Sequence, residues 1–505
     1  MLKSEKFFLF LIFLVFFFLL NWNSFLAPFE RDEGEYAYVA WLMSKGKIPY
    51  RDVFSQKPPM IFYSYFFSQL ISKDAVWPPR ILAVIFSFFS LILVGLIAKK
   101  NWQERGFWIA LFLFLPMSMF PVLTPFAANT EKFMILPLLL VVYFYINPFK
   151  NHLLVLFLTG AFSSTAFFYK PICFPILFFI FFLWFLRLKK EKKIFRLFYL
   201  FLGFFLSSFL ILLPFLLTKT LSYFWECVFV FNFYYVKSFV NPIDNFFYYL
   251  SSFFTYWWIL MPFFILFFYQ PIKFFWFYLL LFFISLITVF SSPMGHYYLQ
   301  VIPFFALIIV GGVIRFLDFF KKEWRVELII LTVFVLVIFM IWPFKIQFYL
   351  TPQQLVTWVY GRVNPFFEAP IVAQKVKEIT NPNDKIFVAG SEQEIYFYTK
   401  RESAIRLILT YPLNVKGYLS TKYQKEAVDE LRKNKPKVIL VVQGPYSGLW
   451  YKNSPKIFIN YLDSILKKEY QLVGGYVWDG DEGSWQAPIK KEAVEKSSFL
   501  VFKKI

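Results

Sequence analysis

The stretch ERDEGEY, residues 30–36, decides how this chain is interpreted, because it sets four carboxylates and a guanidinium between two strongly apolar runs. It is followed by KGKIPYRD at 45–52 and QKPP at 56–59, which add bases, a tyrosine and prolines. Ionisable groups near lipid cost several kcal/mol unless they are paired or hydrated. The stretch therefore predicts a polar active site at a membrane surface, held in place by the hydrophobic segments around it.

The composition indicates a membrane protein. The 505 residues are 59% hydrophobic and 24% aromatic, with 76 Phe and only 16% charged residues, which is far from the usual range of soluble domains. Cys173 and Cys227 both sit in or beside apolar runs and suggest neither a disulfide framework nor a metal cluster. The net charge of +21 could suggest nucleic acid as a partner. We do not expect it, because many bases fall in short loops between apolar segments and no recognition module is visible.

Apolar runs of membrane-crossing length predict an α-helical polytopic protein with about eleven transmembrane helices. The first run, 7–20, follows Lys3 and Lys6 and resembles a signal peptide. No small-residue cleavage site follows it, so we expect a retained helix. The other ten are expected at 81–98, 107–122, 133–146, 153–168, 172–186, 194–217, 246–269, 274–290, 298–314 and 326–341.

The placement of Lys and Arg predicts the orientation. With a cytoplasmic N-terminus, the inner loops hold most of the bases, for example Lys99, Lys100 and Arg105, whereas the outer loops hold few. The exception is the first outer loop, 29–79, where bases alternate with acids. An odd number of spans then puts this loop and the region after residue 345 outside the cytoplasm, in the cell envelope. The aromatic segment 222–242 is expected at the outer interface, equally well as a mobile cover or as an anchor.

The C-terminal region has the pattern of an extracytoplasmic α/β domain at 346–505, after a transmembrane catalytic domain at 1–345. Helices are expected at 369–380, 392–398, 421–433 and 457–468, and strands at 385–389, 404–409, 438–442, 470–477 and 498–502. Neither a dinucleotide fingerprint nor a P-loop occurs in the sequence. The DGD at 479–481 has the form of a metal-holding motif, but its Gly-rich setting favours a solvated hairpin turn. No cofactor is assigned, and a divalent metal is left open.

The first outer loop combines a candidate base with a candidate phosphate ligand. Asp32 and Glu33 directly follow the first span, where partial desolvation can raise a carboxyl pKa toward the range of a general base. Lys57 precedes Pro58-Pro59, which limit backbone freedom and so help to fix the ammonium. Such a pair suits a transfer in which an acceptor hydroxyl loses its proton while a phosphate leaves. The alternative is that these charges neutralise one another in a re-entrant turn.

These motifs resemble the first outer loop of the GT-C superfamily of glycosyltransferases, and in particular the protein O-mannosyltransferase-like enzymes and the lipid A aminoarabinose transferases. The resemblance is carried by RDEGEYAY at 31–38, by Gly46, Pro49-Tyr50-Arg51-Asp52, and by KPP at 57–59 with Tyr63. Three later segments fit the same pattern, and together with the loop they extend it over most of 1–345. They are NTE at 129–131, YKP at 169–171 and GHYYL at 295–299 with Pro303.

The resemblance implies a polyprenyl-phosphate-linked sugar as donor and inversion at the sugar carbon. The acceptor would be a protein, lipid or glycan hydroxyl, and the sugar a hexose or a pentose. Asp32 becomes the base, with Glu33 beside it, and Lys57 holds the donor phosphate. Weaker candidates for the phosphate are Lys170, Arg80, Tyr297 and Tyr298. The cavity and acceptor residues would be Glu131, His296 and Tyr36.

One position departs from the family pattern. The aminoarabinose transferases carry a basic residue three positions after the aspartate, where this chain has Glu35. The candidates to replace that cation are Arg31, Arg51 and Arg80.

Other interpretations remain open at this level. Glu131 with Lys132 could be helix-end charges, Lys170 an outward anchor, and His296 an interfacial hydrogen-bonder. Arg401 could face the cavity from the C-terminal domain, but a solvated surface residue is favoured. For the whole chain, the main alternative is a transporter or flippase of lipid-linked saccharides. We disfavour it because the ionisable groups concentrate at the outer edge and no repeat is visible. A third alternative is a non-catalytic assembly or sensor protein whose tail binds glycans.

Overall fold

The structure is a computed structural model, which describes residues 3–147, 152–236, 242–269, 272–290, 292, 294–321, 325–415, 417–445, 447–479 and 482–505. The chain forms two compact units, each assembled from three separate segments. The helical unit comprises Met1–Phe25, Arg80–Leu212 and Val240–Leu350. The α/β unit comprises Leu26–Pro79, Leu213–Phe239 and Thr351–Ile505. The expected first outer loop and most of the aromatic segment thus pack with the C-terminal region, and the functional division at residue 345 stays a prediction.

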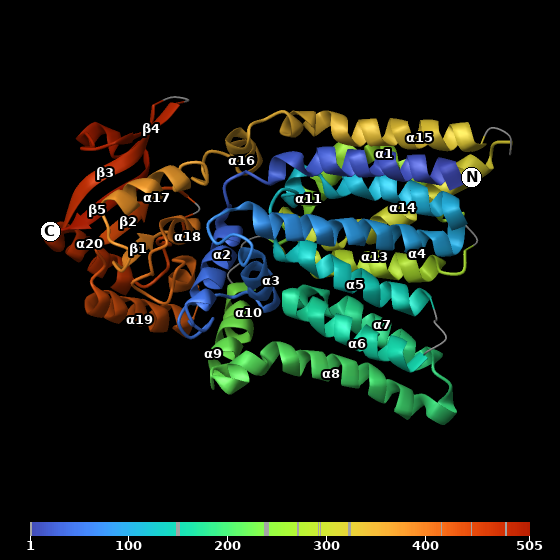
Figure 1. The fold of residues 1–505 in the computed structure, drawn as a ribbon, viewed down its shortest axis with the longest axis horizontal. Coiled ribbons are helices and arrows are strands. Elements are labelled where there is room, and N and C mark those ends of the chain that lie inside the picture. The colour runs from blue at the N-terminus through green and yellow to red at the C-terminus, as the bar shows by residue number, and fades with distance from the viewer. Residues whose placement is uncertain are drawn as a thin grey trace. The chain divides into compact units, whose positions relative to one another are not determined.

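Long apolar helices build the helical unit, and Figure 1 shows them running along a common direction. Each of the eleven expected apolar segments is helical. They correspond to α1 (Lys3–Asn21), the two halves of α4 (Trp77–Ser118), α5 (Thr130–Ile146), α6 (His152–Tyr169), α7 (Phe174–Arg187), α8 (Lys193–Leu217), α11 (Pro242–Trp257) with α12 (Met261–Phe267), α13 (Phe275–Val289), α14 (Ile302–Asp318) and α15 (Arg325–Ile341). The two halves of α4 meet at Gln103, whose φ of 53° and ψ of −144° are not helical.

Six helices of the described residues are long and apolar enough to cross a membrane. They are Ser4–Ser24, Trp77–Ser118, His152–Tyr169, Lys193–Leu217, Pro242–Phe267 and Glu327–Phe348. Several keep large apolar side chains on the surface: Ile194 and Phe205 on α8, for example, are 86% and 64% exposed. Such apolar faces suit lipid rather than water. The chain is a multi-pass membrane protein, while the number of eleven crossings stays a prediction.

Two glycines let α6 and α8 pack backbone against backbone. A Cβ at Gly160 would collide with the carbonyl oxygen of Leu200, and one at Gly203 with that of Phe157. Beside this contact, the hydroxyls of Ser164 and Ser208 lie 2.9 Å apart. Small residues and hydroxyl pairs of this kind are typical of helix interfaces in membranes.

The α/β unit is built around a five-stranded sheet of order β1-β2-β5-β3-β4. The strands are β1 (Ile386–Ala389), β2 (Val438–Val442), β3 (Tyr470–Asp479), β4 (Glu482–Gln486) and β5 (Ser497–Lys504). β1 and β2 are parallel and the other pairs are antiparallel. Every residue of β1 is buried, as expected for a short run of continuous apolar sequence.

Among the described residues, nine α-helices belong to the same unit as this sheet. Four come from the earlier segments of the unit: α2 (Arg31–Ser44), α3 (Met60–Gln69), α9 (Leu221–Trp225) and α10 (Phe231–Val236). The C-terminal region adds α16 (Pro352–Tyr360), α17 (Ala369–Glu378), α18 (Glu394–Thr399), α19 (Tyr418–Asn434) and α20 (Ile457–Glu469). Figure 1 shows the sheet and the C-terminal helices in orange and red.

The expected strand at 404–409 is wrong. Ser403 forms a single bridge with Ile386, and the chain then leaves the sheet. The backbone of Arg406 explains why: its N–H donates to Glu430 Oε2 at 2.8 Å, and its carbonyl accepts from the Phe54 N–H at 2.8 Å. Since these groups already have partners, they cannot extend a ladder.

A strand was missed at 482–486, and it bears on the DGD motif. β4 pairs with β3, and Asp479 lies opposite Glu482, as expected for the two sides of a hairpin. Gly480 and Asp481 lie outside the described residues. The possible metal role of the motif therefore stays untested.

The aromatic segment is helical up to Val236, with a π-helical turn at Glu226–Val230 between α9 and α10. Glu226 forms a 2.8 Å ion pair with Lys422 and accepts a 3.1 Å hydrogen bond from Tyr423. These contacts join this part of the segment to α19, and both the mobile cover and the interfacial anchor stay predictions. Residues 237–241 lie outside the described residues.

Candidate active site

A helix cap positions the candidate base. The Glu30 side chain accepts hydrogen bonds from the N–H groups of Asp32 and Glu33, both at 3.1 Å, and Glu33 reaches back to the Glu30 N–H at 3.4 Å. This reciprocal arrangement is a capping box, and it starts α2 at Arg31. Asp32 consequently lies in the first turn. The structure gives Glu33 a capping role, and its expected catalytic role stays a prediction.

Asp32 and Lys57 are brought together as an ion pair. Lys57 Nζ lies 2.7 Å from Asp32 Oδ2, and the two side chains are 9% and 24% exposed. The Tyr36 hydroxyl donates to the same carboxylate oxygen at 3.3 Å, and Lys57 Nζ lies 5.7 Å from the Tyr36 ring centroid. Together with the N-terminal turn of α2, these groups favour negative charge on Asp32. Three of the candidate residues thus lie together. The pairing of Asp32 with Lys57 is also what the alternative predicts, a loop whose charges neutralise one another, so the catalytic roles stay predictions.

The backbone of Lys57 is fixed by side chains rather than by secondary structure. Its N–H donates to Ser55 Oγ at 3.1 Å, and its carbonyl accepts from the Tyr50 hydroxyl at 2.8 Å. Asn232, from α10, holds the neighbouring Gln56 carbonyl at 2.9 Å. The loop therefore presents the ammonium from a defined position.

Glu35 is buried beside this pair. It is 0% exposed and accepts a hydrogen bond from Ser55 Oγ. Burial raises the pKa of Glu35 to about 7; Lys57 opposes this shift and Asp32 adds to it. The position that departs from the family pattern therefore holds a second carboxyl group near Lys57.

The arginines expected to replace a phosphate contact all have partners of their own. Arg31 forms a 2.7 Å ion pair with Glu392, and Arg51 pairs with Asp52 at 2.8 Å. In the helical unit, Arg80 is 3% exposed and donates to the Ser24 carbonyl at 2.7 Å. A phosphate role for any of them stays a prediction.

The helical unit holds a second polar cluster. Lys170 forms an ion pair with Glu131, and its Nζ lies 3.2 Å from the Tyr297 ring centroid. His296 Nε2 lies 3.6 Å from the same Glu131 carboxylate. The side chains of Glu131, Lys170 and His296 are 2%, 11% and 14% exposed. Three segments that are distant in sequence thus meet, and Lys170 points inward rather than anchoring at the surface.

Tyr298 differs from its neighbour Tyr297. Its ring packs at 5.3 Å from Tyr249 and 5.5 Å from Phe253, measured between centroids. Its hydroxyl is buried and has no hydrogen-bond partner among the described residues. The Tyr298 ring therefore packs among the aromatic side chains of α11, and its expected phosphate contact stays a prediction.

Arg401 is not a solvated surface residue as expected. It is 7% exposed, and its guanidinium donates to Thr380 and to the Thr399 carbonyl at 2.9–3.1 Å. These bonds tie the end of α18 to the end of α17. Its role in this structure is to hold the α/β unit together.

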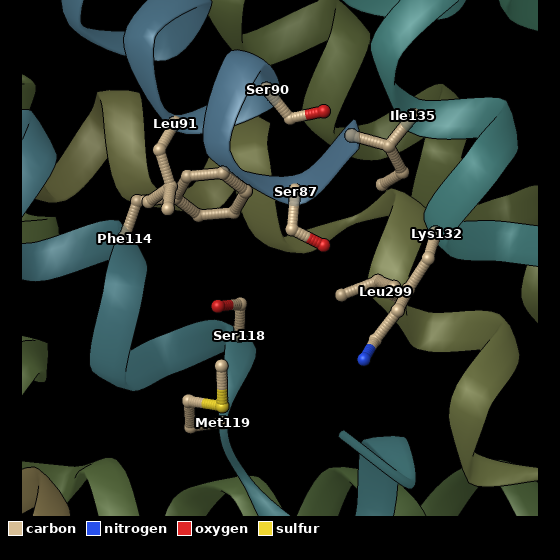
Figure 2. A pocket seen from close by; sticks show the side chains of 9 residues that line it. All are labelled: Ser87, Ser90, Leu91, Phe114, Ser118, Met119, Lys132, Ile135 and Leu299. Atoms are coloured by element: carbon tan, nitrogen blue, oxygen red, sulfur yellow. The ribbon is translucent and has the colours of Figure 1, made fainter. Parts of the chain in front are cut away.

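In the helical unit, a small cavity lies beside α5, the helix that carries Glu131 of the second cluster. Figure 2 shows the side chains that line it, among them Lys132, Ser87 and Ser118. Its volume of about 30 Å³ is far below the several hundred Å³ of a ligand site and suits a few water molecules. We therefore assign it no substrate.

Sequence reasoning missed a group of buried acids in the α/β unit. Glu392 and Glu394 are both 0% exposed. Glu392 pairs with Arg31, whereas neither Glu394 oxygen has a hydrogen-bond partner among the described residues. Burial raises the pKa of Glu394 well above its usual value, and Glu392 adds to the effect. The signal in the sequence was two acids, Glu392 and Glu394, in a run otherwise rich in apolar and aromatic residues.

Comparisons with known proteins define the class of fold. No protein-family model matches the sequence, and no curated protein is similar to it. The solved structure of ArnT from Cupriavidus metallidurans in the apo state matches with a TM-score of 0.59 at 14% identity, over 99% of this chain and 98% of that one. The same protein bound to undecaprenyl phosphate matches with a TM-score of 0.58 at 12% identity, with the same coverage. The oligosaccharyltransferase of Archaeoglobus fulgidus gives a TM-score of only 0.45, at 12% identity over 95% of this chain and 72% of that one.

Over its full length the chain has the fold of ArnT. This confirms the polytopic helical fold with a C-terminal α/β region that is expected from the sequence.

Proposed function

We propose that this protein is an integral-membrane glycosyltransferase that moves a sugar from a polyprenyl-phosphate donor to an acceptor hydroxyl. The observation that carries the proposal is the ion pair of Asp32 and Lys57, which unites a candidate base and a phosphate-binding cation at the start of α2. The fold supports it, because ArnT shares that fold and has been solved bound to undecaprenyl phosphate. The apolar helices fit a donor with a hydrocarbon tail.

In the proposed reaction, the acceptor oxygen attacks the anomeric carbon of the donor sugar. The bond from that carbon to the phosphate oxygen breaks, and polyprenyl phosphate leaves with the electron pair. Asp32 takes the proton of the acceptor hydroxyl, and attack opposite to the leaving phosphate inverts the sugar carbon. Lys57 compensates the charge that develops on the phosphate.

The ion pair suggests an order of events. In this structure Lys57 neutralises Asp32, and a protonated or neutralised carboxylate is a weaker base. A donor phosphate that attracts Lys57 weakens this pairing and makes Asp32 available to the acceptor. We therefore propose that the donor binds first.

The second cluster is proposed to contribute to donor or acceptor binding. Lys170 with Tyr297 offers a cation on an aromatic face, and Glu131 with His296 offers hydrogen-bonding groups. Glu33, Arg80, Tyr298 and Tyr36 remain candidates in the roles expected above. We also propose a cytoplasmic N-terminus, an active site on the outer face and an extracytoplasmic α/β region, on the basis of the charge distribution.

The function is tested with purified protein in lipid nanodiscs and in sealed vesicles. Undecaprenyl phosphate that carries radiolabelled arabinose, aminoarabinose, mannose or glucose is supplied with a lipid, peptide or glycan acceptor. We expect one donor to be cleaved, with undecaprenyl phosphate and glycosylated acceptor formed in equal amounts. Movement of intact donor across the vesicle membrane without cleavage would favour the transporter instead.

A further inference from the structure

We propose that Glu35 is a positioning residue, which acts through the Ser55 hydroxyl to hold Lys57 where it meets the donor phosphate. The proposal rests on the proposed function of Lys57 and extends it to two residues that have no assigned role. It also assigns a role to Glu35, which stands where the aminoarabinose transferases carry a basic residue.

A continuous hydrogen-bonded path links the three residues. Ser55 Oγ donates to Glu35 Oε1 and accepts from the Lys57 N–H at 3.1 Å. A hydroxyl has one proton to donate and two lone pairs that accept. Because the Ser55 hydroxyl donates its hydrogen bond to Glu35, one of its oxygen lone pairs is directed at the Lys57 N–H. Without Glu35 the hydroxyl can rotate, and this constraint is lost.

The local sequence makes such support necessary. Pro58 and Pro59 follow Lys57 and have no N–H groups with which to build a regular ladder. Two side chains contact the Lys57 backbone: Ser55 accepts from its N–H, and the Tyr50 hydroxyl donates to its carbonyl. Each of these contacts therefore bears directly on where the ammonium lies.

Glu35 and Asp32 both lie on α2, so the helix fixes the distance between them. They are three residues apart, so both side chains lie on one face of the helix. Asp32 contacts the Lys57 side chain, and Glu35 reaches its backbone through Ser55. The helix thus holds both ends of the same lysine. Burial of Glu35 at 0% exposure keeps water from competing for the Ser55 hydroxyl.

Binding of undecaprenyl phosphate alone tests the proposal, measured on the full-length protein in nanodiscs. The variants are Ser55→Ala and Glu35→Ala, which break the path, and Glu35→Gln and Ser55→Thr, which keep an acceptor and a hydroxyl. Ser68→Ala serves as a matched control, because this buried serine of α3 donates to the Tyr65 carbonyl at 2.8 Å and lies outside the path. Melting temperatures identify variants that fail to fold.

We expect Ser55→Ala and Glu35→Ala each to weaken binding about 3- to 10-fold, the equivalent of one hydrogen bond. The double variant is expected to be no weaker than the worse single one, because both break one path. Glu35→Gln, Ser55→Thr and Ser68→Ala should stay within about twofold of the wild type. The proposal falls if folded Ser55→Ala binds like the wild type, or if Glu35→Gln binds as weakly as Glu35→Ala. Failure of the wild type itself to bind undecaprenyl phosphate would instead overturn the proposed function.

Discussion

Lys57 Nζ lies 2.7 Å from Asp32 Oδ2, so the cation proposed for the donor phosphate is held by the proposed base. The residues are 25 positions apart, and a capped helix start and a supported loop bring them together. Lys57 is 9% exposed and Asp32 is 24% exposed, so the carboxylate stays in contact with water when Lys57 exchanges to a phosphate. The pair is therefore suited to change partners during a reaction.

The first prediction concerns Lys57→Ala. Loss of a charge-assisted hydrogen bond to phosphate should lower kcat/KM for the donor about 10- to 100-fold. The free energy of unfolding should fall by about 1–3 kcal/mol, because Lys57 is buried and Asp32, at 24% exposure, loses its cation but keeps contact with water. Steady-state kinetics with varied donor and denaturation in detergent measure the two effects. Lys45→Ala, which removes a more exposed pair with Glu402, is the control. An unchanged KM and kcat for the donor would exclude the phosphate role.

The second prediction concerns the buried pair of the helical unit. Lys170→Met leaves the Glu131 carboxylate, 2% exposed, without its main cation and should destabilise the protein by about 3–5 kcal/mol. Combining it with Glu131→Gln should recover part of this loss, because the double variant has no uncompensated charge. Denaturation in detergent micelles compares the two. A single variant as stable as the wild type would mean that Lys170 does not neutralise Glu131.

The third prediction concerns the contact between α2 and α18. A Cβ at Gly34 would lie 2.5 Å from the N, Cα and Cβ atoms of Glu394, closer than packed atoms tolerate. Gly→Ala inside a helix normally stabilises by up to about 1 kcal/mol, whereas Gly34→Ala should destabilise by about 1–3 kcal/mol. It should also lower transfer, because Asp32 is on the same helix. Gly444→Ala, whose Cβ would meet nothing closer than 3.4 Å, is the control for thermal melting. Stabilisation by Gly34→Ala would contradict the contact.

Deletion of the C-terminal region is a poor test of its role, because this region packs with the segment that carries the candidate site. Residues 351–505 pack with 26–79 in one compact unit, and Arg31 pairs with Glu392. Loss of transfer on truncation would reflect loss of this support as well as any direct function.

The fourth prediction concerns pH. Burial raises the pKa of Glu394 in the folded protein, and the neighbouring Glu392 and Glu30 carboxyls raise it further, while Arg31 lowers it. A raised pKa means that Glu394 binds a proton more tightly in the folded state than in the unfolded state. Proton binding therefore stabilises the fold at low pH, and this contribution is lost as the pH rises. The melting temperature should therefore fall as the pH rises above the usual pKa of a glutamate, and Glu394→Gln should flatten this slope. An identical slope in Glu394→Gln would show that other groups cause it.

The sequence predicted the apolar helices and the polar loop because both leave local patterns. The eleven expected apolar runs are helical, and Asp32, Tyr36 and Lys57 of the polar loop lie together, while their catalytic roles stay predictions. The strand at 404–409 failed because Arg406 directs its backbone to Glu430 and Phe54, partners that no local pattern reveals. The roles of Glu33 as a cap and of Glu35 as support for Ser55 were missed for a similar reason. These roles depend on the direction of each side chain: Glu33 contacts the start of α2, and Glu35 contacts Ser55 of the loop. A local sequence pattern does not distinguish two acids that lie so close together.

The fifth prediction is the most direct test of the account, and it compares Asp32→Asn with the wild type in single-turnover transfer from the donor identified above. Asparagine keeps the shape of the side chain but cannot accept the proton, so we expect transfer to fall about 10²- to 10⁴-fold. Binding of undecaprenyl phosphate and the melting temperature should stay close to the wild type. Near wild-type turnover by folded Asp32→Asn would contradict the assignment of Asp32 as the base.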